Sequence, residues 1–226
     1  MGYIIIQETS MTSPKKTERH YYLHPTRYID SDYPSVINFV CNHIANDVDP
    51  VTQAVQLFYA VREKIRYDPY HIDIPREHFC ASTVLKKKTG FCVEKALVLA
   101  AGSRVLGIPS RLGFADLINH QVPPKLHEKM GTNLFVFHGY AELFVNKTWV
   151  KATPAFEQSL CENAHLQPIE FDGKHDALFH PLDTKGQPHI SYLRDQGRYA
   201  DLPYDLIMRA YRKHYPRFFN DTIDEG

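Results

Sequence analysis

Thr89-Gly90-Phe91-Cys92-Val93-Glu94-Lys95-Ala96 is the stretch that decides the fold. Gly90 allows the chain to bend, and the apolar residues that follow predict a buried helix over residues 92–106, at the centre of the molecule. Cys92 would stand in the first turn of this helix. Unpaired backbone N–H groups and the helix dipole at that position lower the pKa of a thiol, although a buried cysteine is also compatible with plain core packing.

A histidine follows 46 residues later in an apolar, strand-like run, Phe135-Val136-Phe137-His138-Gly139-Tyr140. Two strands are predicted, at 133–145 and 148–152, with Asn146-Lys147 as a two-residue hairpin turn. The register of this hairpin makes His138 and Thr153 diagonal neighbours on one face, with Cβ atoms about 7 Å apart. The sequence therefore predicts that Thr153 contacts the imidazole of His138.

The remaining pattern indicates helices first and antiparallel strands afterwards, which is typical of the α+β class. Ser31-Asp32-Tyr33-Pro34 and Asp49-Pro50 each open a helix. The chain is expected to be a flexible extension (residues 1–20) and a single domain (21–226), with a core at about 50–156 and a C-terminal extension at 157–226. Within these parts the pattern predicts loops at 67–80 and 116–132, a short strand at 110–114, turns within 157–202 such as Gln196-Gly197, and a basic helix at 204–215.

Composition excludes several functions. The formal net charge is +0, from 26 basic and 26 acidic residues, so binding to nucleic acid is not expected. No apolar run is long enough to span a membrane, and no secretory signal is visible. The four cysteines form no CxxC pair, and the 13 histidines show no metal-binding spacing. We therefore expect a reduced, cytoplasmic protein without metal or cofactor; the sequence does not indicate an oligomeric state.

Two segments resemble those of a known family. Residues 89–96, continued by Ser103–Arg111, resemble the cysteine segment of the transglutaminase-like superfamily, and His138–Pro154 resembles its histidine hairpin. The similarity covers about residues 50–156, and the flanking segments resemble extensions found in a bacterial branch. The resemblance implies a papain-like core in which the cysteine helix packs on an antiparallel sheet. It also implies that Cys92 is the nucleophile and His138 the general base and acid.

The third catalytic position departs from the family, in which an aspartate usually precedes the proline of the second hairpin strand. Thr153 stands there, and its hydroxyl can orient an imidazole but supplies no charge. Asp116, Asn119 and Asp172 are polar alternatives that nothing in the sequence places near His138.

Two functions follow from this pattern. The first is cysteine-dependent acyl chemistry on a protein, peptide or other amide substrate through a thioester; water would make the protein a hydrolase (amidase or protease), and an amine would make it an acyltransferase of the transglutaminase type. The second is a catalytically weak or inactive fold that acts as a protein-binding module.

Overall fold

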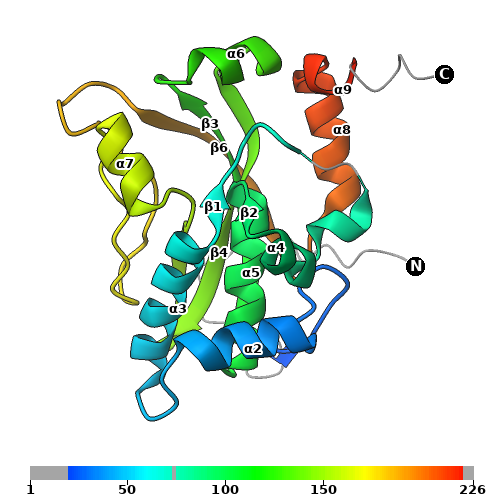
Figure 1. Cartoon of the computed structure of the whole chain (residues 1–226), viewed down its shortest axis with the longest axis vertical. Helices are drawn as coiled ribbons and strands as arrows, with labels where there is room; N and C mark the ends of the chain where they lie inside the picture. Colours follow the sequence, from blue (N-terminus) through cyan, green and yellow to red (C-terminus); the bar gives the residue numbers. More distant parts are fainter. Residues whose placement is uncertain (1–19, 73–74, 221–226) are drawn as a thin grey trace.

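The computed structural model describes residues 20–72 and 75–220, so the extension expected at residues 1–20 lies outside the described residues except for His20. Figure 1 shows the arrangement of the elements. Their bounds are α2 (Pro34–His43), α3 (Pro50–Lys64), β1 (Arg66–Tyr67), the 3-10 helix η1 (Arg76–Phe79), α4 (Ala81–Lys87), β2 (Thr89–Gly90), α5 (Cys92–Val105), β3 (Ser110–Asn119), α6 (Pro124–Met130), β4 (Leu134–Val145), β5 (Thr148–Ala152), α7 (Gln158–Ala164), β6 (Ile190–Tyr199), α8 (Tyr204–His214) and α9 (Arg217–Asn220).

The molecule is an α+β fold, as expected from the order of the elements. Its main sheet has four antiparallel strands in the order β5-β4-β3-β6. Helix α5 packs against β3 and β4 on one side and against α2, α3 and α4 on the other, which places it between the sheet and the other helices (Figure 1). The cysteine-bearing helix is therefore the central layer of the fold.

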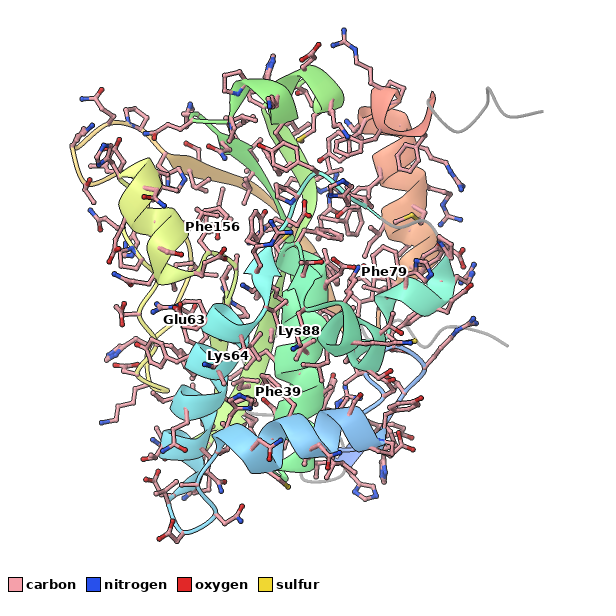
Figure 2. All side chains as sticks on the ribbon, viewed as in Figure 1. Phe39, Glu63, Lys64, Phe79, Lys88 and Phe156 are labelled. Atoms are coloured by element: carbon pink, nitrogen blue, oxygen red, sulfur yellow. The ribbon has the colours of Figure 1, made fainter. Side chains whose placement is uncertain are left out.

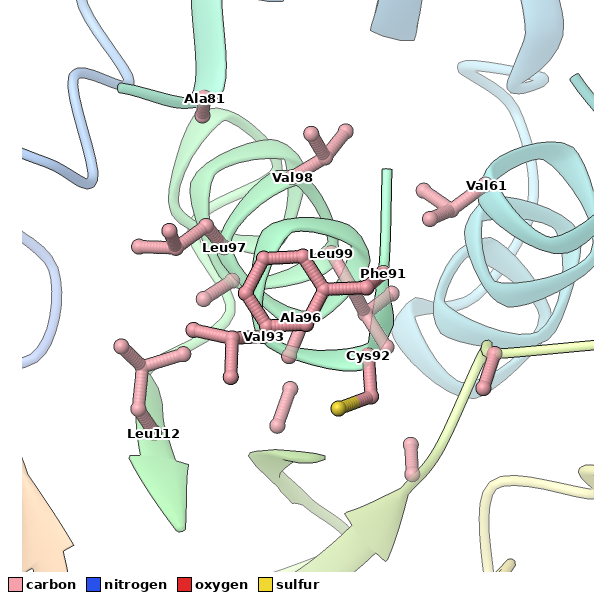
Figure 3. Close-up of a cluster of buried hydrophobic side chains, with 14 of the residues drawn as sticks. Val61, Ala81, Phe91, Cys92, Val93, Ala96, Leu97, Val98, Leu99 and Leu112 are labelled. Atoms are coloured by element: carbon pink, nitrogen blue, oxygen red, sulfur yellow. The ribbon is translucent and has the colours of Figure 1, made fainter. Parts of the chain in front are cut away.

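Helix α5 is buried around its whole circumference, as its sequence predicts. All residues from Cys92 to Arg104 are buried, and their side chains radiate on every side of the helix axis (Figure 3). Gly107 follows the helix with a φ of +72°, the left-handed conformation expected after a helix end. A helix that has no polar face cannot lie at the surface without exposing apolar side chains to water. This explains why α5 lies in the core.

The β4–β5 hairpin has the predicted register. Phe144 pairs with Trp149 and Val145 with Thr148. The two turn residues, Asn146 and Lys147, have φ values of 49° and 65°, which is the left-handed pair that a type I′ turn requires. The start of α3 is also as expected, because the Asp49 side chain accepts hydrogen bonds from the first free N–H groups of the helix.

Several elements differ from the prediction. The strand expected at 110–114 extends to Asn119, and the segment expected as loop at 116–132 contains α6. Helices α4 and α7 were not predicted. Helix α6 has seven residues and ends at Gly131 in the left-handed conformation. Elements of this length contain too few turns to show an apolar period, so the sequence does not reveal them.

Strand β6 is the largest correction, because the turn expected at Gln196-Gly197 lies inside it. Phe114 of β3 pairs with Gly197 and Ala115 pairs with Asp195, so Gln196 is an extra residue in the ladder. Gly197 has a φ of +95°. The glycine therefore marks a β-bulge in a continuous strand, and bulges and turns use the same residue types.

Candidate active site

The first turn of α5 is held by Glu94. Its carboxylate accepts a hydrogen bond from the Phe91 backbone N–H at 3.0 Å and forms an ion pair with Lys87. A Cβ atom at Gly90, two residues before the helix, would lie 3.1 Å from the Glu94 carboxylate, so glycine at this position leaves room for the carboxylate to reach the Phe91 N–H. The Gly90–Glu94 pattern thus starts the helix at Cys92.

The Cys92 side chain points from this turn toward the strands of the main sheet (Figure 3). It is 7% exposed, and burial raises the pKa of its thiol to about 11, although hydrogen bonds from the backbone N–H groups of Gly139 and Val93 act in the opposite direction. The expectation of a lowered thiol pKa is therefore not met in this conformation. The helix terminus acts as expected, but the loss of water outweighs it.

Strand β4 lies very close to α5 at Gly139. A Cβ atom at this position would lie 2.9 Å from the Cα atom of Val93, a distance that real Cβ atoms do not adopt. Only glycine allows the strand to come this near to the helix. At this distance the Gly139 N–H donates a hydrogen bond to the Cys92 sulfur. The neighbour of Gly139 in the chain, His138, then lines the same pocket as Cys92.

A β-bulge in β4 precedes His138. Phe137 has a φ of 53°, and its N–H donates to Oδ1 of Asp116 at 3.0 Å. The other oxygen of Asp116 accepts from Nε2 of Gln196 at 2.6 Å. Asp116, one of the polar alternatives for the third position, therefore holds the backbone next to His138 rather than the imidazole itself.

The His138 imidazole lies among aromatic side chains. Its centroid is 4.9 Å from that of Phe179 and 6.4 Å from that of Tyr192, and the residue is 4% exposed. Burial lowers the pKa of His138 to about 3. Its buried Nε2 atom has no hydrogen-bond partner in the described part of the chain. At neutral pH the imidazole is therefore neutral.

Thr153 is fully buried, and its hydroxyl has no partner among the described residues. The structure thus contains no hydrogen bond between Thr153 and His138. The backbone N–H of Thr153 donates to the carbonyl of Ala177 at 3.0 Å, which ties the hairpin to the C-terminal segment. Of the other polar alternatives, Asp172 is bound to His175 and Asn119 accepts from the Gln121 N–H.

One pocket joins Cys92 and His138. It leaves a free volume of about 40 Å³, and its walls come from segments far apart in the chain. They include the loop after β1, helices α6, α8 and α9, the start of α5 and strand β4. The lining residues are Tyr67, Pro69, Ile72, Phe91, Cys92, Leu126, Met130, Phe135, Val136, His138, Tyr211, Tyr215 and Phe218.

The C-terminal helices cover the pocket and are fixed to its walls. The Tyr215 hydroxyl accepts a hydrogen bond from the Val136 N–H at 2.6 Å. Phe79 lies between α4 and the start of α8, where its ring is 5.5 Å from that of Tyr204 (Figure 2). The sequence predicted a helix at 204–215 but gave no sign that it faces Cys92.

Tyr67 is held at the pocket by a buried ionic network. Its backbone N–H donates to Glu157 at 3.0 Å, and Glu157 lies 3.8 Å from Nζ of Lys95. Lys95 also donates to the carbonyls of Arg62 and Ile65, which end α3, and burial lowers its pKa to about 7. On the other side, Phe156 packs edge-on against the Tyr67 ring at 4.7 Å (Figure 2).

Within residues 20–72 and 75–220, no cluster of three or more histidine, cysteine or acidic side chains is arranged to bind a metal ion. All four cysteines are free thiols. None of the helices in the described part of the chain has the length and apolar character that a membrane span requires.

The family follows from the sequence profile of the transglutaminase-like superfamily, which matches residues 38–154. This match covers more than half of the chain, and the chain belongs to this superfamily. No curated protein matches the chain. Among solved structures it is similar to a candidate cysteine protease from Cytophaga hutchinsonii, with a TM-score of 0.48 and 13% identity over 80% of this chain and 54% of that one. The chain thus spans about half the length of that protein.

Proposed function

We propose that the protein performs acyl chemistry on an amide or peptide carbonyl through a thioester at Cys92. The observation that carries this proposal is the pocket that both Cys92 and His138 line, with hydrogen bonds from the backbone N–H groups of Val93 and Gly139 to the Cys92 sulfur. Membership of the transglutaminase-like superfamily supports cysteine-based catalysis at the level of the family. A thiol, an imidazole and backbone donors are the groups that acyl transfer needs.

The first half-reaction starts from a neutral pair, because burial keeps the thiol protonated and the imidazole neutral at pH 7. As the sulfur attacks the carbonyl carbon, the thiol proton passes to His138. The backbone N–H groups at the helix start stabilise the oxyanion. His138 then returns the proton to the departing amine, the C–N bond breaks, and a thioester on Cys92 remains.

In the second half-reaction His138 accepts a proton from the acceptor, whose oxygen or nitrogen attacks the thioester. The C–S bond breaks, and the proton on His138 restores the Cys92 thiol. With water as acceptor the protein is a hydrolase; with an amine it is an acyltransferase. Hydrolysis and acyl transfer would use the same residues of the protein, Cys92 and His138.

A binding module without catalysis is the second candidate function, and one observation favours it. Nε2 of His138 and the hydroxyl of Thr153 are both buried without partners among the described residues, so nothing there stabilises an imidazolium. If His138 cannot become an imidazolium, the Cys92 thiolate is not stabilised, and Cys92 reacts slowly as a nucleophile.

The test is the rate of iodoacetamide labelling of Cys92 between pH 6 and 10, followed by mass spectrometry in wild type, His138→Ala and His127→Ala. Cys41 is exposed and serves as the reference thiol in the same molecule. His127 is an exposed residue of α6 and provides the matched control. Base catalysis by His138 predicts that labelling of Cys92 at pH 7 falls at least about tenfold in His138→Ala and is unchanged in His127→Ala.

A result that contradicts base catalysis by His138 would favour the binding module. If Cys92 reacts only near or above the ordinary thiol pKa of about 8.5, at the same rate in wild type and His138→Ala, the pair does not work and the binding module is correct. If the pair works, products formed from amide substrates with and without an added primary amine distinguish the hydrolase from the acyltransferase.

A further inference from the structure

The walls of the pocket around Cys92 are apolar and aromatic. Leu126 and Met130 come from α6, Tyr211 comes from α8, Tyr215 is the residue that follows α8, and Phe218 comes from α9. Among the described residues, the lining contains no aspartate, glutamate, lysine or arginine. An ionised group placed here would lose its water without meeting an opposite charge from these walls, so its binding is unfavourable.

The Cys92 thiol and the His138 imidazole indicate that the pocket disfavours charged groups. Burial raises the pKa of the Cys92 thiol and lowers that of the His138 imidazole, so both groups are driven toward their neutral forms. A carboxylate or ammonium on a substrate would experience the same environment.

The pocket is also small. Its free volume of about 40 Å³ leaves room for only a few water molecules. The walls are tied in place, because Tyr215 is bonded to the backbone of β4 and Tyr67 to Glu157. A short aliphatic group suits a space of this size, whereas a long or branched chain requires the walls to move.

We propose that the pocket selects a short, uncharged, apolar acyl group for attachment to Cys92. The proposal rests on the acyl chemistry of Cys92 proposed above and names the class of acyl donor that this chemistry uses. The rest of the donor, including the leaving amine, lies outside the pocket and is not restricted by it.

A matched pair of reagents tests the selection against charge without requiring catalysis. Iodoacetamide and iodoacetate have nearly the same size and differ in charge. At pH 9.5 the ratio of their alkylation rates is measured for Cys92 and for the exposed Cys41 in one sample. We expect the ratio at Cys92 to exceed that at Cys41 at least about 30-fold, as a difference of about 2 kcal/mol requires. Ratios within about threefold of each other would overturn the proposal.

Two neighbouring phenylalanines of α9 provide variants for this test. Phe218 lines the pocket, whereas Phe219 packs against the core without lining it. Phe218→Lys adds a cation beside the pocket and is expected to reduce the Cys92 ratio about tenfold. Phe219→Lys is expected to leave the ratio at the wild-type value. Equal ratios in the two variants would contradict the assignment of this wall; near-UV circular dichroism verifies that both are folded.

A series of p-nitrophenyl esters tests the size of the acyl group. Acetyl, propionyl, butyryl, hexanoyl and monosuccinyl esters are compared by the rate at which Cys92 becomes acylated, read by mass spectrometry. We expect about a fourfold gain for each methylene up to butyryl, no further gain at hexanoyl, and a monosuccinyl rate at least about 30-fold below butyryl. A monosuccinyl rate equal to that of butyryl would refute the selection.

The outcomes separate the two proposals. If no ester acylates Cys92 while the alkylation ratio stays high, the pocket excludes charge but the acyl chemistry is wrong. If all esters acylate Cys92 at similar rates, the acyl chemistry is correct and the selection of the acyl group is wrong.

Discussion

Replacement of His138 by glutamine should change how the stability of the fold depends on pH. The imidazole is 4% exposed, and burial lowers its pKa to about 3 from an ordinary value of 6.5. Between these two pH values the unfolded chain binds a proton at this residue that the folded chain does not bind. The stability contributed by a neutral His138 is therefore complete above pH 6.5 and is lost as the pH falls toward 3.

The size of this effect follows from the proton difference. Each pH unit below 6.5 costs about 1.4 kcal/mol of unfolding free energy for one proton. At pH 5.0 the loss is about 2 kcal/mol, which is a large part of the stability of an ordinary domain. His138→Gln cannot gain a proton and lacks this loss, whatever its stability at neutral pH.

The assay is urea unfolding of wild type, His138→Gln and His127→Gln at pH 7.5 and pH 5.0. The stability difference between wild type and His138→Gln should shift by about 2 kcal/mol between the two pH values, in favour of the variant at pH 5.0. Burial also lowers the pKa of His189, but this contribution is common to all three proteins and cancels. His127→Gln should show the wild-type dependence, because its side chain is exposed.

A difference that is the same at both pH values would show that His138 is solvated in the folded protein, against the structure. A shift in the opposite direction would show that folded His138 gains a proton, as in a thiolate–imidazolium pair with Cys92.

Three further substitutions test the geometry of the site. Gly139→Ala should force β4 away from α5, lowering the unfolding free energy by about 1–3 kcal/mol in urea titrations and slowing the labelling of Cys92; wild-type values for both would contradict the close approach. Glu94→Ala removes the carboxylate that starts α5, and thermal unfolding should show a loss of about 2–3 kcal/mol, whereas a loss below about 0.5 kcal/mol would mean that the helix start does not depend on it. Thr153→Asp should raise the pKa of His138. The loss of unfolding free energy between pH 7.5 and pH 5.0 should then become smaller, and labelling of Cys92 at pH 7 should become at least about tenfold faster. Unchanged labelling would show that this position does not face the imidazole.

The centre of the fold could be predicted from local signals. The apolar run at 96–101 favours a buried helix, and Gly107 follows the end of that helix in the left-handed conformation that glycine adopts readily. The hairpin was predictable because a two-residue turn fixes the register of both strands. The α+β class, and the superfamily to which the chain belongs, follow from these segments.

The cover of the site could not be predicted, because it depends on contacts between residues far apart in the chain. Tyr211 and Tyr215 have the spacing of an apolar helix face, but periodicity does not say which neighbour that face meets. Phe179 lies in a segment without regular structure and still packs on His138. Burial by distant residues raises the pKa of the Cys92 thiol. The sequence reveals only the helix terminus, which favours a lower pKa, and the prediction made from it was therefore wrong in direction.

The origin of the walls has a consequence for biosynthesis. Both reactive residues lie within residues 38–154, whereas Phe179, Tyr211, Tyr215 and Phe218 lie beyond them. A ribosome adds about 5–20 residues per second, so about 4 to 16 seconds separate the synthesis of His138 from that of Phe218. At the start of this interval the nascent chain already contains Cys92 and His138, and the side chains that cover them in the folded protein have not yet been added. Until Phe218 has been added, the Cys92 thiol is more accessible to oxidants than it is in the folded protein, where it is buried.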